Sequence, residues 1–306
     1  MPTWNTLDAR APRIIAHRGA SGYLPEHTLA GYALGARLGA DVIEPDLVMS
    51  RDGVLHARHD LILSPTTDVA SHADLAGRRD VLDGRLDWWV CDFDAAEIGQ
   101  LRSVQRESQR PHRHDGEFPV PTFTSILALA RELSVELGRT VGVYPEIKHP
   151  VFFRQCGLDP VPALVEALLK TGMHGPDAPV WLQCIDAAVL REAFEACGNP
   201  SYVLMDAASR SVEGASFLTS LAPWARGIAP DRAMLWDRHG NDSGLVDAAH
   251  AAGLEVHAWT FRDDADPEPF ASPRALLQAA MTLGVDALFC DFPDTAVSVR
   301  DVMSAP

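Results

Sequence analysis

The chain has 306 residues, and 47% of them are hydrophobic, which is enough for a large core and excludes a disordered or fibrous protein. The 26 lysine and arginine residues face 42 aspartate and glutamate residues, so the formal net charge is −16. Nucleic acids and anionic membrane surfaces repel such a charge at long range, and we expect neither as a partner.

Short apolar segments rich in β-branched residues recur along the chain and predict strands. In chain order they cover residues 13–17, 41–47, 141–147, 180–185, 201–205, 227–230, 254–261 and 286–291. Amphipathic segments lie between most of them and predict helices at residues 28–39, 123–138, 162–172, 187–198, 244–253 and 273–284. Strands that alternate with helices predict a parallel sheet covered by helices, and eight such units predict a (β/α)8 TIM barrel, which needs about 250 residues.

The excess length is concentrated in one region. Between residues 60 and 118 the alternation of strand and helix lapses, and the segment contains the polar run RESQRPHRHDG. Just before it, Asp52-Gly53 is typical of a hairpin turn. We therefore predict a single domain over residues 1–306 in which residues 60–118 are an insertion after the second strand, forming a small subdomain or a loop over one mouth of the barrel.

The compartment is predicted from features that the sequence lacks. No apolar stretch approaches the roughly 18 residues that a membrane span needs, so we expect no stable membrane insertion. The first 15 residues show no basic segment followed by an apolar run, which predicts a cytoplasmic protein, or a periplasmic one if the sequence is a mature form. The five scattered cysteines form no C-x-x-C pair and are expected to be reduced thiols.

Ionisable residues follow the first three predicted strands at their carboxyl ends, where barrel enzymes carry their chemistry. They are His17, Arg18, Glu44, Asp46, Glu146 and Lys148. Because residues i and i+2 of a strand share a face, Glu44 and Asp46 point the same way. Three carboxylates at one rim repel one another unless a cation joins them, which predicts a hard divalent ion such as Mg²⁺ or Ca²⁺. The alternative is salt bridging to Arg18 and Lys148.

Two histidines lie close to these carboxylates in the predicted barrel. Histidine is the side chain best suited to proton transfer near neutral pH, so His17 and His59 are candidates for an acid/base pair, although a buried histidine is more often a satisfied core group. Asp60 would orient His59 or cap a turn, and Asp291 would form a salt bridge at the mouth. With Arg18 and Lys148 as fixed positive charges, the set fits chemistry on a phosphoryl group.

The sequence resembles the glycerophosphodiester phosphodiesterase family, in particular its bacterial members. The resemblance rests on HRGASGYLPEHT (17–28), GADVIEPDLVMSRDGVLHARHD (39–60), PEIK (145–148), LQC (182–184) and AWTF (258–261). These motifs occur in family order along nearly the whole chain. The sequence departs from the often periplasmic bacterial branch in showing no signal peptide.

The resemblance implies a role for each matching residue. Glu44, Asp46 and Glu146 would hold one divalent metal ion, and His17 and His59 would be the general acid/base pair. Arg18 and Lys148 would bind the phosphate, while Gln183 and Trp259 would line the substrate pocket.

The resemblance also implies a reaction. A small glycerophosphodiester would be cleaved to sn-glycerol 3-phosphate and an alcohol, with the neighbouring glycerol hydroxyl attacking phosphorus and water opening the resulting cyclic phosphate. Two alternatives stay open. One is a phospholipase D type of enzyme acting on lysophospholipids, which would expose an apolar lip. The other is a barrel that only binds a phosphoester, which would require a missing acid/base group.

Overall fold

The structure is a computed structural model that describes residues 4–82, 84–207 and 215–305. Its strands form a closed parallel ring, because β1 (Arg13–His17) pairs with β2 (Val42–Glu44) on one side and with β13 (Ala287–Cys290) on the other. The ring continues through β3 (Asp46–Met49), β7 (Gly142–Val143), β8 (Glu146–Ile147), β9 (Leu182–Cys184), β10 (Ser201–Met205), β11 (Gly227–Pro230) and β12 (Glu255–Phe261). This confirms the predicted TIM barrel.

Two of the predicted strands are divided at a proline. Pro45 separates β2 from β3, and Pro145 separates β7 from β8, because proline has no N–H for the strand ladder. The halves keep the same neighbour, since β2 pairs with β7 and β3 pairs with β8. The proline carbonyls still accept hydrogen bonds, Pro45 from the amide of Glu146 at 2.9 Å and Pro145 from that of Gln183 at 3.0 Å. Each break therefore lies directly beside the predicted site.

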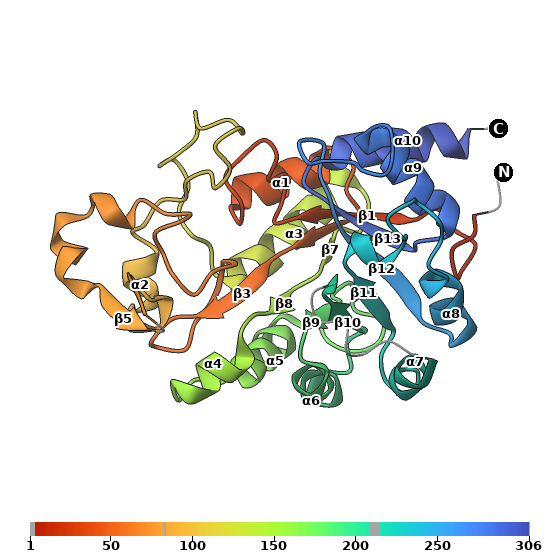
Figure 1. Cartoon of the computed structure of the whole chain (residues 1–306). Coiled ribbons are helices and arrows are strands. Elements are labelled where there is room, and N and C mark those ends of the chain that lie inside the picture. The colour runs from red at the N-terminus through yellow and green to blue at the C-terminus, as the bar shows by residue number, and fades with distance from the viewer. Residues whose placement is uncertain (1–3, 83, 208–214, 306) are drawn as a thin grey trace.

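Helices cover the outside of the ring (Figure 1). The six predicted ones are present as α1 (Leu29–Arg37), α3 (Phe123–Leu137), α5 (Pro160–Thr171), α6 (Ala187–Cys197), α8 (Leu245–Ala251) and α9 (Pro273–Leu283). Side-chain caps fix several of their starts, as where the Thr28 hydroxyl accepts from the Gly31 amide. The sequence did not predict α4 (Pro150–Gln155), α7 (Ala215–Leu221) or α10 (Pro293–Ser304).

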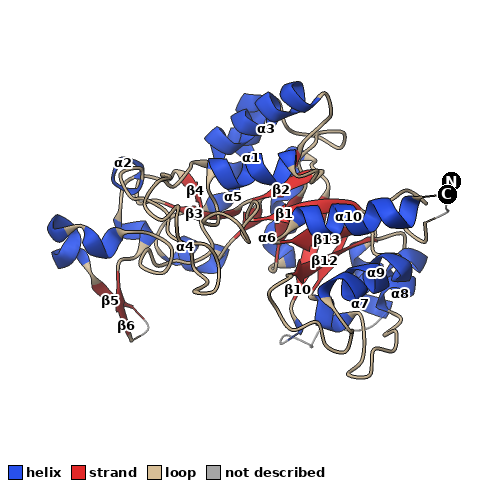
Figure 2. Ribbon diagram, turned by 90° about the horizontal axis from the view of Figure 1, so that it is seen from above, coloured by secondary structure: helices blue, strands red, loops and turns tan. Residues whose placement is uncertain are grey.

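The segment between residues 60 and 118 has its own local structure. The antiparallel strand β4 (Leu55–Ala57) leads into it after a hairpin in which Gly53 has φ +83°. The segment contains the β5–β6 hairpin (Asp80–Leu82 and Arg85–Asp87) and the short helix α2 (Ala95–Ile98). Both views place this hairpin and α2 on the side of the molecule away from α8, α9 and α10 (Figures 1 and 2). Residues 105–110 then return to the barrel, where they contact its mouth.

None of the helices in the described part of the chain combines the length and the apolar character that crossing a membrane requires.

Candidate active site

Three carboxylates, two of them buried and one half-buried, meet where the divided strands lie side by side. Asp46 on β3 is paired in register with Glu146 on β8, and Glu44 is the last residue of β2. One ligand atom from each of Glu44, Asp46 and Glu146 lies within 4.8 Å of the others. Glu44 and Asp46 are each only 1% exposed. The structure thus brings together the three residues that the sequence predicted as metal ligands.

The electrostatics of this cluster favour a bound cation. Burial, with the like charges of Asp46 and Glu146, raises the pKa of Glu44 well above its ordinary value. Burial likewise raises the pKa of Glu146 to about 8. The pKa of Asp46 is lowered, because Lys148 and Arg18 outweigh the effect of its burial. Three carboxylates that cannot all ionise on their own are the donor set that a hard divalent ion stabilises.

Gln183 also favours a cation bound at this cluster. It lies on β9 next to Glu146, and its Nε2 donates to Glu44 Oε1 at 2.9 Å. Its buried Oε1 has no hydrogen-bond partner among the residues that the structure describes. An acceptor oxygen left over beside three carboxylates adds a neutral oxygen to the donor set, so the residues present fit a divalent ion.

His17 ends β1 beside this cluster, paired in register with Glu44. Its Nδ1 lies 2.6 Å from Asp291 Oδ1, just past the end of β13. Burial and the nearby Arg18 lower the pKa of His17 to about 4, against the opposing effect of Asp291. Asp291 stays ionised, because His17 and the guanidinium groups of Arg262 and Arg110 lower its pKa despite its burial. The imidazole is therefore neutral, donates from Nδ1 and presents Nε2 as a base.

His59 reaches the site from the segment after β4. Its Nδ1 lies 2.8 Å from Asp60 Oδ1, so Asp60 orients His59, one of the two roles considered from the sequence. The His59 side chain is one-third exposed. His149, which follows Lys148 directly, hydrogen-bonds the backbone of His59. His59 therefore lies near the carboxyl end of β8, on the side of the site that Lys148 occupies.

The two predicted phosphate-binding residues are both paired with acidic groups. Lys148 Nζ lies 3.0 Å from Glu146 Oε1, and Arg18 Nε lies 3.1 Å from Asp46 Oδ2. The Arg18 backbone amide also donates to Glu44 Oε2 at 2.9 Å. The salt bridging considered from the sequence is thus present, and it places both cations against the carboxylate cluster.

Trp259 lies on β12, farther around the ring. Its Nε1 donates to the Ala229 carbonyl at 2.7 Å, and the residue forms a parallel bridge with Asp231 at the end of β11. This hydrogen bond fixes the ring at the mouth of the barrel, where it is partly exposed.

Three further residues, none of them predicted for the site, contact its side chains or the carboxylates beside its histidines. His27 is buried, with Nε2 3.0 Å from Asp46 Oδ2 and Nδ1 2.8 Å from the Tyr32 hydroxyl. Arg106 and Arg110 come from the insertion and contact Asp60 and Asp291. Membership of the HRGASGYLPEHT motif pointed to His27, but no local pattern distinguishes the two arginines from their solvated neighbours.

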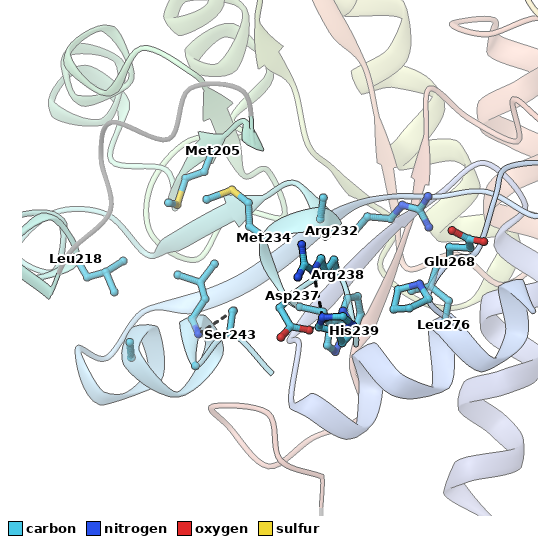
Figure 3. A pocket seen from close by; sticks show the side chains of 16 residues that line it. Met205, Leu218, Arg232, Met234, Asp237, Arg238, His239, Ser243, Glu268 and Leu276 are labelled. Carbon is cyan, nitrogen blue, oxygen red and sulfur yellow. Dashed lines mark hydrogen bonds between the residues drawn. The ribbon is translucent and has the colours of Figure 1, made fainter. Parts of the chain in front are cut away.

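A cavity with a volume of about 1100 Å³ lies elsewhere (Figure 3). Its lining includes Met205, Leu218, Met234 and Arg232, and none of the nine residues predicted for the site. Arg232 follows Asp231, the residue bridged to Trp259, so the cavity begins beside the β11–β12 side of the mouth. Among the described residues that line this cavity there is no cluster of acids comparable to Glu44, Asp46 and Glu146.

The model of the glycerophosphoryl diester phosphodiesterase family matches residues 17–295. Glycerophosphodiester phosphodiesterase GDPD6 of Arabidopsis thaliana is 30% identical, over 99% of this chain and 89% of its own. Glycerophosphodiester phosphodiesterase of Haemophilus influenzae is also 30% identical, over 93% of this chain and 88% of its own.

Solved structures share the fold at lower identity. A phosphodiesterase from Oleispira antarctica, in complex with the product sn-glycerol-3-phosphate, is 22% identical with a TM-score of 0.69, covering 97% of this chain and 99% of its own. A glycerophosphodiester phosphodiesterase from Agrobacterium tumefaciens is 22% identical with a TM-score of 0.66, and the match covers 94% of this chain and 99% of its own. The family model spans the first barrel strand to the last helix, and the chain belongs to the glycerophosphoryl diester phosphodiesterase family.

Proposed function

We propose that this protein hydrolyses glycerophosphodiesters to sn-glycerol 3-phosphate and an alcohol, with a divalent metal ion and two histidines. The observation that carries the proposal is the meeting of Glu44, Asp46 and Glu146 within 4.8 Å, with His17 paired in register beside them. Family membership and the product bound by the Oleispira relative support the choice of substrate.

The two histidines divide the proton transfers between them. His17 is neutral, the form that accepts a proton, so it takes the proton of the attacking glycerol hydroxyl at Nε2. His59 gives a proton to the oxygen of the leaving alcohol. The bond from the hydroxyl oxygen to phosphorus forms as the bond to the leaving oxygen breaks. Water then opens the cyclic phosphate by the reverse proton transfers.

The cations and the aromatic ring position the substrate. Arg18 and Lys148 would offset the negative charge of the phosphate, since both lie against the carboxylate cluster. Trp259 would cover the glycerol or the leaving group at the mouth. Glu44, Asp46 and Glu146 would hold the metal ion, which supplies Lewis-acid stabilisation of the phosphoryl oxygens when bound.

The test is an assay with glycerophosphocholine and either Mg²⁺ or Ca²⁺, with sn-glycerol 3-phosphate and choline quantified separately. We expect both products in equal amounts with metal and none after chelation. Release of phosphocholine and glycerol instead would show cleavage of the other phosphoester bond. Absence of product with either metal would reject the proposal.

A lysophospholipid is the second candidate substrate, and the cavity beside β11 favours it. Met205, Leu218 and Met234 give that cavity an apolar part, which fits an acyl chain. Met234→Glu would place a charge there. If acyl-bearing substrates are the natural ones, this variant loses turnover of lysophosphatidylcholine and keeps turnover of glycerophosphocholine. If the variant turns over each of the two substrates as fast as the parent protein does, this second candidate is rejected.

We also propose that residues 1–306 form one catalytic domain into which residues 60–118 are inserted. The contacts that residues 105–110 make with the barrel mouth support this division, because they join the segment to the site rather than to a separate core.

A further inference from the structure

Each of the two histidines is oriented by a carboxylate through its Nδ1 atom. His17 faces Asp291 Oδ1 at 2.6 Å, and His59 faces Asp60 Oδ1 at 2.8 Å. An ionised carboxylate only accepts hydrogen bonds, so it fixes the proton on Nδ1 and leaves Nε2 for the reaction. Neither Nε2 atom has a hydrogen-bond partner within residues 4–82, 84–207 and 215–305.

Both orienting carboxylates are in turn bound by an arginine of the insertion. Arg106 Nη2 donates to Asp60 Oδ2, and Arg110 Nη2 donates to Asp291 Oδ2, each at 2.6 Å. In both cases the arginine takes the carboxylate oxygen that the histidine does not use. Two arginines separated by only three residues thus make equivalent contacts, one behind each histidine.

The arginines are themselves held by the barrel. Arg106 binds Glu26 through Nε at 3.0 Å and Nη2 at 2.9 Å, and Arg110 binds Asp264 through Nε at 2.8 Å and Nη2 at 3.0 Å. Arg110 is 8% exposed, and its Nη1 also donates to the Ser21 carbonyl at 3.2 Å. Such bidentate contacts fix the plane of a guanidinium group. Lysine cannot make them, because its ammonium group is a single point of charge.

Arg110 is placed to control the geometry of Asp291 rather than simply to neutralise it. Arg262 Nε also lies 3.1 Å from Asp291 Oδ2, so the buried carboxylate keeps one cation when Arg110 is removed. What Arg110 adds is a fixed direction for the carboxylate, through its anchors on Asp264 and Ser21. The insertion therefore acts on the site through orientation.

We propose that Arg106 and Arg110 are positioning residues, through which the insertion holds both histidines with Nε2 directed at the substrate. This inference rests on the proposed function only in taking His17 and His59 as the acid/base pair.

The first test uses Arg110→Gln and Arg110→Lys in the full chain, with Arg113→Ala as the control. Arg113 is exposed and contacts its neighbour His114. We expect Arg110→Gln to lower kcat about tenfold to hundredfold while KM and the Mg²⁺ or Ca²⁺ dissociation constant stay within threefold. Arg110→Lys should recover only part of kcat. A kcat within threefold of the parent value, or a loss of metal affinity instead, would overturn the proposal.

A second variant guards against misfolding of the first. Asp264→Asn weakens the anchor of Arg110 but leaves the contact between Arg110 and Asp291 intact, and it lies at an exposed position. It should lower kcat in the same direction as Arg110→Gln and by a smaller factor. An unchanged kcat in this variant would count against the proposal.

A third measurement does not depend on turnover. Proton–nitrogen correlation spectra of the histidine rings, assigned with His17→Gln, report whether the proton sits on Nδ1 or Nε2. We expect an Nδ1–H signal for His17 in the parent protein and a mixed tautomer in Arg110→Gln. An inactive parent protein would reject the proposed function alone, whereas an unchanged tautomer in the variant would reject the positioning role alone.

Discussion

Asp46 and Glu146 lie directly opposite each other on the parallel strands β3 and β8, each placed just after a proline that divides its strand. Their side chains face the same mouth of the barrel, together with Glu44. Burial and the charge of Asp46 raise the pKa of Glu146 to about 8 although Lys148 lies 3.0 Å away, so this carboxyl group is harder to ionise in the metal-free protein than an ordinary glutamate.

Metal binding should therefore release a proton. A hard ion binds the ionised carboxylate, so the affinity for Mg²⁺ or Ca²⁺ should rise with pH up to about 8. Calorimetry in two buffers of different ionisation enthalpy would measure the proton release. Glu146→Gln should reduce the release, leaving the part that comes from Glu44, and weaken binding roughly tenfold or more, while Glu132→Gln on the exposed face of α3 should change neither. An affinity independent of pH would contradict this prediction.

Removing either histidine should block the chemistry without unfolding the protein. His17→Asn and His59→Asn should each lower kcat by about 10²–10⁴, the usual contribution of general acid/base catalysis. Asp291 keeps Arg110 and Arg262 as partners in His17→Asn, so the fold should be retained. Turnover of glycerophosphocholine and thermal unfolding would be measured together, with the exposed His174→Asn as control. Near-normal turnover in either variant would contradict the assignment.

Trp259 should affect substrate binding more than chemistry. Trp259→Ala should raise KM about tenfold, equivalent to about 1.4 kcal/mol, with a smaller change in kcat. Trp259→Phe keeps an aromatic ring but loses the hydrogen bond to Ala229, so its KM should lie between that of the parent protein and that of Trp259→Ala. Trp224→Phe, at a position that packs against Phe194, is the control. A fall in kcat at constant KM would argue for a different role.

Stability should fall in acid because of the ion pairs around Glu26. Burial would raise the pKa of Glu26, but Arg18 and Arg106 lower it overall from its ordinary value of 4.5. The unfolded chain then binds more protons below pH 4.5, so this contribution is present above that pH and lost as the pH falls. Urea unfolding at pH 7, 5, 4 and 3 should show a shallower loss for Glu26→Gln than for the parent protein or Glu195→Gln. Parallel curves for all three would contradict the prediction.

The periodicity of the apolar residues, with the glycine and proline residues at the ends of the elements, was enough to predict the barrel. The bounds of β1, β10 and β11 coincide with the predicted segments, because apolar residues and turn signals define them locally. The sequence also gave reason to expect carboxylates at one rim, since the spacing of Glu44 and Asp46 follows from strand geometry alone. It did not predict α10, whose sequence lacks a strong apolar stripe.

The contacts that Arg106 and Arg110 make with acidic residues beside the histidines could not be predicted from local sequence patterns. Arg110 lies 181 residues from Asp291 in sequence, and Arg106 lies 80 residues from Glu26. Their neighbours in the polar run, such as His112 and Arg113, are exposed, and nothing in composition separates the two groups. Such pairs are decided by how the insertion folds back onto the barrel, which depends on packing across the whole molecule.

The adjacency of β1 and β13 has a consequence for how the protein matures. The imidazole of residue 17 emerges early during synthesis, whereas its carboxylate partner at residue 291 is made near the end. A nascent chain can assemble its acidic cluster from residues 44 to 146 long before this dyad exists. The contact between His17 and Asp291 therefore forms last, when the final strand docks against the first and closes the barrel.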